Sequence, residues 1–287
     1  MSSPEERRAQ FAADLDRELA SGELTFPTSM QAALKIRRAL EEEDASIATV
    51  ARIVGLEPLV SVKLLRMANS AFYNRQGEEV TDVHRALMRI GLRNTRIIAM
   101  AVIGDQMATA AEFAPVSRLA EQLWRHTLDV ASLAYAIALQ LDDDTVTPDT
   151  ALLAGMVHDI GQFFLLGRVH AYPELLQEQD EMSEFILLWH HKVSQQVLSA
   201  LGTPELIVHA LDNQDAPSGN WPPSSLSDII YLANSAAGTP NPFSILSLEE
   251  LIVRRQDAFK EVAREQLDRL LDEARVQRAA ALSMLSA

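Results

Sequence analysis

The decisive stretch of this sequence is Gly155-Met156-Val157-His158-Asp159-Ile160-Gly161, which lies inside an apolar run with helical spacing. Two adjacent polar side chains, His158 and Asp159, occupy the middle of that run, with a glycine on each side. Burying an unpaired polar group costs roughly 1–3 kcal/mol, so both side chains need partners. The pattern therefore predicts metal ligands or the remnant of a metal site, and other ligands elsewhere in the chain decide between an enzyme and a non-enzyme.

Two further histidines are candidates for such ligands. His126 falls on the apolar stripe of an expected helix over residues 116–141, and His190 aligns with Ile186, Val193 and Val197 in another over 183–201. Imidazole and carboxylate groups suit divalent Zn, Fe and Mn, and such an ion can polarise a phosphate and lower the pKa of bound water. From spacing alone, hydrogen-bonded core histidines remain the favoured interpretation.

The rest of the chain predicts an all-α protein. Hydrophobic residues make up 48% of the sequence, enough for a substantial core, and abundant Ala and Leu favour helices. Helical periodicity dominates and no convincing alternating strand is found. Helices are expected at 4–20, 27–42, 46–54, 58–69, 81–90, 94–107, 116–141, 183–201, 204–213 and 226–237, with one opening at Thr147 that carries His158 and Asp159 and a long one from Ser247 to about 285.

Breaks between these helices suggest four parts. An N-terminal helix occupies residues 1–22, a helical block follows over 23–110, a second block covers 115–240, and a helical appendage covers 243–287. The appendage has an apolar stripe, which predicts either folding back onto the core or a surface for a homodimer or another partner. Folding back is the expectation for part of the stripe.

Charge and composition exclude several classes of protein. The formal net charge of −15 repels nucleic acid and favours solubility, and the chain has no cysteine for disulfides or Cys-ligated metals. The N-terminal residues are charged and lack the apolar core of a signal peptide, and no apolar run reaches the roughly 20 residues that cross a bilayer. We therefore expect a cytoplasmic protein that does not bind membranes.

Residues 46–67 have the spacing of a helix-turn-helix, which would place the second helix in a major groove of DNA. That helix offers only Lys63 and Arg66 as cations, although phosphate contacts supply much of the affinity for DNA. Two packed helices are the preferred interpretation, and DNA binding is kept as an alternative.

Several blocks together resemble a known family. They are Leu24-Thr25-Phe26-Pro27-Thr28; Leu56-Glu57-Pro58-Leu59 with Lys63-Leu64-Leu65-Arg66-Met67-Ala68-Asn69-Ser70-Ala71-Phe72-Tyr73; Val80, Ala86-Leu87 and Ile90-Gly91-Leu92; and Trp124-Arg125-His126, the Gly155–Gly161 stretch and His190. In these blocks residues 23–235 resemble an HDOD domain, a relative of the HD and HD-GYP phosphohydrolases that occurs in bacterial signalling proteins. The second block is the most specific.

The resemblance implies a multi-helix bundle with an HD-like helical core and an N-terminal helical subdomain. It also implies a non-catalytic signalling output or scaffold module that binds other signalling proteins. Within the family motif, Pro58 opens a helix, and Asn69 and Ser70 are expected to satisfy its last carbonyls. The alternative is that Arg66 and Asn69 anchor the first helical block against the second.

The functional prediction rests on the positions where this sequence differs from the catalytic HD enzymes. By resemblance, His126, His158 and Asp159 match the first metal ligands. Asn234 stands where the enzymes have a late Asp; Asn213 and Gln214 stand where many relatives have a His-His pair; and no Gly-Tyr-Pro motif is present. We therefore expect no catalytic residue and no cofactor, with a chiefly structural His-Asp pair. The alternative is a metal-dependent phosphohydrolase that holds a divalent ion with His126, His158, Asp159 and His190.

Overall fold

The computed structural model describes residues 4–21, 46–55, 58–75, 77–95, 98–99, 116–141, 146–169, 172, 179–200 and 203–244, with residues 250, 253, 265–266, 268–275 and 278 of the C-terminal segment. The described regular structure is helical, without a strand, so the all-α prediction is confirmed. Two compact units form: Met1–Phe26 with Ala108–Ala279, and Pro27–Met107 with Ala280–Ala287. No described helix is long and apolar enough to cross a membrane.

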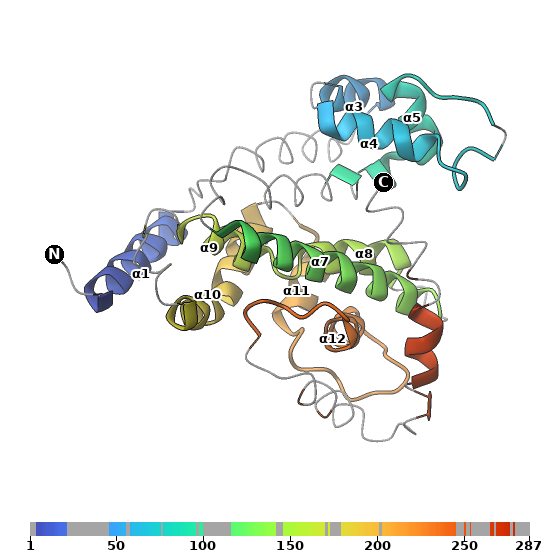
Figure 1. The fold of residues 1–287 in the computed structure, drawn as a ribbon. Helices are drawn as coiled ribbons and strands as arrows, with labels where there is room; N and C mark the ends of the chain where they lie inside the picture. The colour runs from blue at the N-terminus through green and yellow to red at the C-terminus, as the bar shows by residue number, and fades with distance from the viewer. Residues whose placement is uncertain are drawn as a thin grey trace. The chain divides into compact units, whose positions relative to one another are not determined.

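The smaller unit contains α3 (Ile47–Val54), α4 (Pro58–Ala68) and α5 (Val83–Ile90) (Figure 1). Helix α3 begins where the Ser46 side chain accepts a hydrogen bond from the Thr49 amide, and α5 begins where Asp82 accepts one from the Arg85 amide. Gly91 ends α5 with φ of 84°, a conformation that favours glycine. These local signals place the helix boundaries where the sequence predicts them.

The family motif closes the loop between α4 and α5. The Asn69 side chain accepts a hydrogen bond from the Val80 amide and donates one to the Val80 carbonyl, both at 2.7 Å. Ser70 Oγ donates to the Met67 carbonyl at 2.7 Å, so Ser70 caps the helix as expected. Asn69 instead ties Val80 to the end of α4, within the smaller unit, while the Arg66 side chain is exposed.

The larger unit is built around α7 (Ser117–Ala138), which is buried over most of its circumference. Helices α8 (Pro148–Val157) and α12 (Leu226–Ala236) pack against α7 (Figure 1). Helix α10 (Gln179–Ala200) packs against α9 (Ile160–Leu166). Helix α11 (Glu205–Asp212) packs against both α10 and α12. Residues 213–225 connect α11 to α12 without a helix, as the Pro and Gly content predicts.

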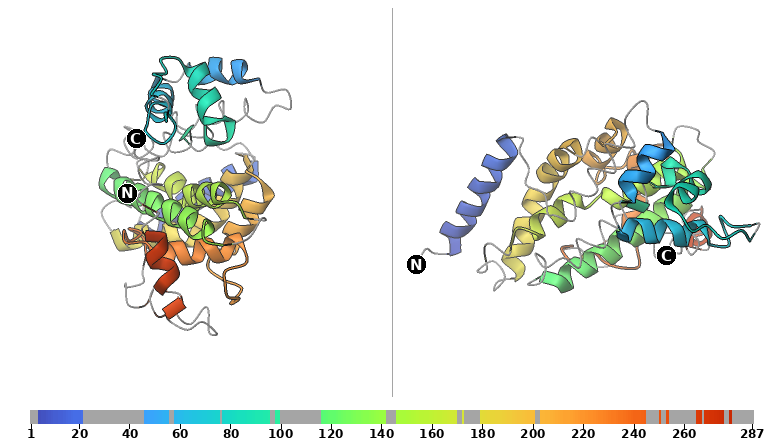
Figure 2. Two further views of the ribbon diagram at one scale, coloured as in Figure 1. Left: turned by 90° about the vertical axis from the view of Figure 1, so that its right-hand side faces the viewer. Right: turned by 90° about the horizontal axis from the view of Figure 1, so that it is seen from above.

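Helix α1 (Pro4–Ser21) belongs to the larger unit, although it is distant in sequence (Figure 2). Its apolar side is buried, and the Phe11 ring stacks on Phe185 of α10 with centroids 4.7 Å apart. The Tyr172 hydroxyl donates to Asp14 at 2.7 Å, and Arg168 Nε donates to Glu18 at 3.1 Å. The N-terminal helix is therefore an integral part of this core. The sequence-based domain boundaries remain predictions.

Part of the C-terminal appendage folds back onto the larger unit. Residues 268–275 are helical, with Leu271 and Ala274 buried, and Gln140, two residues after the end of α7, donates from Nε2 to the Leu270 carbonyl at 3.3 Å. Most of the expected helix to residue 285, like the expected helix over 27–42, lies outside the described residues. A homodimer through this appendage remains a prediction.

Candidate metal centre

The His-Asp pair lies at a junction between helices, and the prediction of one continuous helix through it is wrong. Helix α8 ends at Val157 and α9 begins at Ile160, with Asp159 at φ −107° and ψ 20° between them. On an unbroken helix, neighbouring side chains do not face each other. The break allows His158 and Asp159 to direct their side chains to one point.

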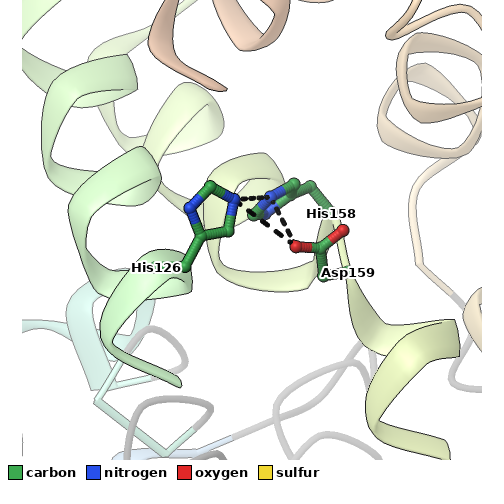
Figure 3. Close-up of side chains that lie close together, drawn as sticks. All are labelled: His126, His158 and Asp159. Carbon is green, nitrogen blue, oxygen red and sulfur yellow. Dashed lines mark hydrogen bonds and ion pairs between the residues drawn. The ribbon is translucent and has the colours of Figure 1, made fainter. Parts of the chain in front are cut away.

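His126 joins the pair from α7. Asp159 Oδ2 lies 3.0 Å from His158 Nε2 and 3.6 Å from His126 Nε2, and the two Nε2 atoms are 3.4 Å apart (Figure 3). All three side chains are almost fully buried. The structure therefore brings together three of the residues that the sequence nominates as ligands.

Both imidazoles are oriented by backbone carbonyls. His126 Nδ1 lies 2.7 Å from the Thr239 carbonyl oxygen, and His158 Nδ1 lies 2.8 Å from that of Gly155. A carbonyl can only accept, so each Nδ1 carries the donated proton. This arrangement fixes the tautomer in which a neutral ring presents an Nε2 lone pair, as metal-binding histidines do.

The three atoms have the spacing of a divalent-ion site. Ligands on a tetrahedral ion with bonds of about 2.0–2.1 Å lie about 3.3 Å from one another. The observed separations of 3.0, 3.4 and 3.6 Å bracket that value. Two imidazoles and a carboxylate therefore fit Zn or a similar ion in both chemistry and geometry.

The charges of His126, His158 and Asp159 shift one another's pKa values. Burial works to raise the pKa of Asp159, but the positive charge and hydrogen bond of His158 outweigh it and hold that pKa at about 2. For His158, burial acts to lower the pKa, but Asp159 reverses this effect and the pKa is raised. Burial dominates for His126, whose pKa is lowered. The negative charge of Asp159 therefore favours a proton on His158 Nε2, which would donate to Asp159 Oδ2.

Two amide side chains complete the surroundings of the carboxylate. Gln162 Nε2 donates to Asp159 Oδ1 at 3.0 Å, and Asn241 Nδ2 lies 2.8 Å from Asp159 Oδ2 and 3.0 Å from Gln162 Oε1. Sequence reasoning missed Gln162, Asn241 and Thr239. Gln162 follows Asp159 by three residues, which is a usable signal. Thr239 lies 113 residues from His126 in the chain, and Asn241 lies 82 residues from Asp159.

A cavity of about 300 Å³ opens beside the centre. Its wall includes most of the positions that the sequence nominates, namely His126, Asp159, His190, Gln214 and Asn234. His158 does not line this cavity, and His190 lies outside the cluster formed by His126, His158 and Asp159. Asn213 is exposed and donates to the His209 carbonyl at 2.9 Å, so it does not reach the cavity.

An ion pair at the edge of this cavity provides a pH-dependence prediction. His191 Nε2 lies 3.1 Å from Asp215 Oδ2, and the hydrogen bond with Asp215 raises the pKa of His191 above its ordinary 6.5. The hydrogen bond with His191 lowers the pKa of Asp215 from 3.8. The pair therefore stabilises the fold most between pH 3.8 and 6.5, and this stabilisation is lost as the pH rises through the pKa of His191 or falls through that of Asp215.

We expect an NMR titration of the His191 ring to give a midpoint above 6.5 in the unmodified protein and a lower one in Asp215→Asn. Asp212→Asn is the control, because Asp212 contributes less to the shift. Equal midpoints in the unmodified protein and Asp215→Asn would contradict the pairing. The effect on stability should be small, because both side chains are substantially exposed.

Comparison with known proteins identifies a family and several solved structures of similar fold. The model of the HDOD domain matches residues 26–217. A solved structure from Shewanella amazonensis SB2B, described as a proposed metal-dependent phosphohydrolase, is 24% identical with a TM-score of 0.70, covering 96% of this chain and 99% of its own. An HDOD domain protein of unknown function from Geobacter sulfurreducens is 18% identical with a TM-score of 0.57, covering 99% of each chain.

A solved structure from Marinobacter aquaeolei VT8, described as a proposed signal transduction protein, is 15% identical with a TM-score of 0.56. The match covers 98% of this chain and 67% of that one. These identities are low, so the likeness shows the fold. An uncharacterized protein of Treponema pallidum is 23% identical over 149 residues, or 52% of this chain. The chain spans only 27% of the length of that curated relative.

Proposed function

This chain belongs to the HDOD family, and from that membership we propose that it is a non-catalytic signal-transduction output or scaffold module that binds other signalling proteins. One observation carries the non-catalytic part. The cavity wall has the amides Gln214 and Asn234 at positions where the family resemblance requires histidine and aspartate for hydrolysis.

The charge balance explains why this replacement matters. Asp159 is the one carboxylate of the described three-residue cluster, and its oxygens already accept hydrogen bonds from Gln162 and Asn241. With two neutral imidazoles, a divalent ion in the cluster would keep a net charge of +1. A second carboxylate would neutralise this charge, whereas the neutral amide of Asn234 cannot. Binding of a cation should therefore be weak.

A metal-dependent phosphohydrolase is the second candidate, and the spacing of the three ligand atoms favours it. Catalytic zinc sites commonly use three protein ligands and leave a position open for water. His126, His158 and Asp159 would hold the ion, which when bound supplies Lewis acidity toward a phosphate. The cavity beside Asp159 would give a substrate access to this position.

A hydrolysis assay separates the two candidates. The purified full chain is incubated with bis(p-nitrophenyl) phosphate and added Mn²⁺, Fe²⁺ or Zn²⁺, in parallel with His158→Ala and Asp159→Ala. The matched control is His209→Ala, since His209 is an exposed histidine of α11 that does not line the cavity. We expect one background rate in all four proteins. A metal-dependent rate present in the unmodified protein and His209→Ala but lost in the other two would establish the hydrolase instead.

The interaction part requires its own experiment. Affinity capture with the intact chain from its native cell identifies binding proteins, and the strongest of these is purified and mixed with this protein. A stoichiometric complex with a dissociation constant in the micromolar range or below supports the scaffold function. If no captured protein binds in the purified mixture, the interaction part of the proposal is rejected.

A further inference from the structure

A buried carboxylate of α7 connects the C-terminal segment to the candidate metal centre. Asp129 lies three residues after His126 and is 2% exposed. Its Oδ2 accepts a hydrogen bond from the Thr239 amide at 2.9 Å, and its Oδ1 lies 2.7 Å from Arg278 Nη2. The two carboxylate oxygens therefore join the loop after α12 to the C-terminal segment.

Thr239 continues this connection to a metal ligand. Its amide N–H donates to Asp129, while its carbonyl accepts the Nδ1 proton of His126 at 2.7 Å. One residue is thus held at two points on consecutive turns of α7. The hydrogen bond to His126 fixes both the tautomer and the plane of the ring, and thereby directs Nε2 toward Asp159.

The same loop also reaches the carboxylate ligand. Asn241 follows Thr239 by two residues, donates to Asp159 Oδ2 at 2.8 Å, and accepts a hydrogen bond from the Phe243 amide through its own Oδ1 at 2.8 Å. Residues 237–244, which we call the clamp loop, therefore contact two of the three ligands. The clamp loop and Arg278 both lie beyond residue 217, where the family match ends.

We propose that Arg278 is a positioning residue for the metal centre: paired with Asp129, it holds the clamp loop where Thr239 orients His126. The C-terminal segment thereby controls the affinity of the centre for a divalent cation. This inference goes beyond the proposed function and holds whether or not the centre hydrolyses a substrate, so its failure would leave that function standing.

Loss of Arg278 should loosen the clamp loop, because Asp129, which holds Thr239 of this loop, is buried and would lose its charged partner. Removing one partner of a buried charge pair leaves the remaining charge poorly compensated. Movement of the loop toward water relieves that cost, but it also withdraws the Thr239 carbonyl from His126. Residues that orient metal ligands typically change metal affinity 10–100-fold when they are replaced.

The sign of the effect separates positioning from simple electrostatics. Replacing an arginine by methionine removes a positive charge, which by itself favours binding of a cation. Positioning predicts the opposite, a weaker site. Arg275→Met is the matched control, because Arg275 lies three residues earlier and forms an exposed pair with Asp272 at 2.9 Å. Both variants lose the same charge, and only one loses the contact with Asp129.

The test is a Zn²⁺ titration against a chromophoric chelator, using the full chain. We expect Arg278→Met to bind Zn²⁺ about tenfold more weakly than the unmodified protein, with Arg275→Met unchanged or slightly tighter. Asp129→Asn, which removes the shared anchor, should also weaken binding. Equal affinities in Arg278→Met and Arg275→Met would overturn the proposal.

A second measurement uses metal-free protein and needs no cation. In imidazole ¹⁵N–¹H NMR spectra, the Nδ1 proton of His126 reports its hydrogen bond to Thr239. This signal should shift or vanish in Arg278→Met and persist in Arg275→Met, with unchanged helical content by circular dichroism. If Arg278→Met does not fold, Arg278→Lys should give a smaller shift of the same kind. An unchanged signal in the folded variant would overturn the proposal even if Zn²⁺ does not bind.

Discussion

Replacement of Gly161 by alanine should lower the free energy of unfolding of the larger unit by more than about 3 kcal/mol, or prevent its folding. An added Cβ would lie 2.3 Å from the His190 carbonyl oxygen and 2.4 Å from Ser194 Oγ. The Ser194 backbone nitrogen would be 2.8 Å away. Two of these three atoms belong to the backbone of α10, so no change of rotamer can relieve the clash.

The contact that would be lost is specific. The Gly161 amide donates to Ser194 Oγ at 3.1 Å, so α9 and α10 approach closely enough for a backbone-to-side-chain hydrogen bond. Overpacking a core usually costs 1–3 kcal/mol, and we place this substitution above that range because backbone atoms are involved. Separation of α9 from α10 would also displace Asp159, which directly precedes α9.

Urea denaturation followed by circular dichroism measures the effect, and Gly238→Ala is the matched control. Gly238 is exposed, and a Cβ there would meet only Asp129 Oδ2 at 3.7 Å, an ordinary van der Waals distance. Its midpoint should stay close to that of the unmodified protein. A Gly161→Ala variant as stable as the Gly238→Ala variant would contradict the described packing of α9 against α10.

The glycines also show where sequence reasoning stops. A glycine on each side of the His-Asp pair is visible in the sequence, but its cause is tertiary. A Cβ on Gly155 would lie 2.5 Å from Ala131 Cα of α7, while Gly161 faces α10. The His-Asp pair therefore lies between α8, which packs closely on α7, and α9, which packs closely on α10. No local pattern in the sequence identifies α7 and α10 as these neighbours.

Helix boundaries were predictable because their signals are local. Ser46, Asp82 and Thr147 each accept a hydrogen bond from the amide three residues later, and each caps the helix expected there. The helix break at His158 and Asp159 was not predicted, because the apolar run continues on both sides and conceals it. Helical periodicity cannot distinguish one helix from two that are joined at a buried turn.

The site was predictable to the extent that its residues lie on apolar helix faces. The side chains of His126, His158 and Asp159 converge, and His190 lines the same cavity as His126 and Asp159. Asn213 does not line this cavity, because it follows the last residue of α11 and is exposed to solvent. The residues that orient the ligands, such as Thr239 and Asn241, come from an irregular loop whose partners depend on the complete fold.

Asn234→Asp should increase the affinity for Zn²⁺ about tenfold to a hundredfold, and this prediction tests the charge argument directly. Asn234 lines the cavity beside Asp159, so the substitution adds a carboxylate to the wall of the candidate centre. Opposite unit charges 4 Å apart attract by about 4 kcal/mol near a protein surface, and desolvation of the new carboxylate removes part of that gain. Each remaining 1.4 kcal/mol or so gives a factor of ten.

Asn213→Asp is the matched control, because it makes the same chemical change at an exposed site outside the cavity wall. Competition with a chromophoric chelator should rank Asn234→Asp well above both the control and the unmodified protein. If both variants bind Zn²⁺ equally, the added charge acts only at long range and Asn234 does not face the cation. If Asn234→Asp hydrolyses bis(p-nitrophenyl) phosphate and the unmodified protein does not, one missing carboxylate would account for the lack of catalysis that we propose.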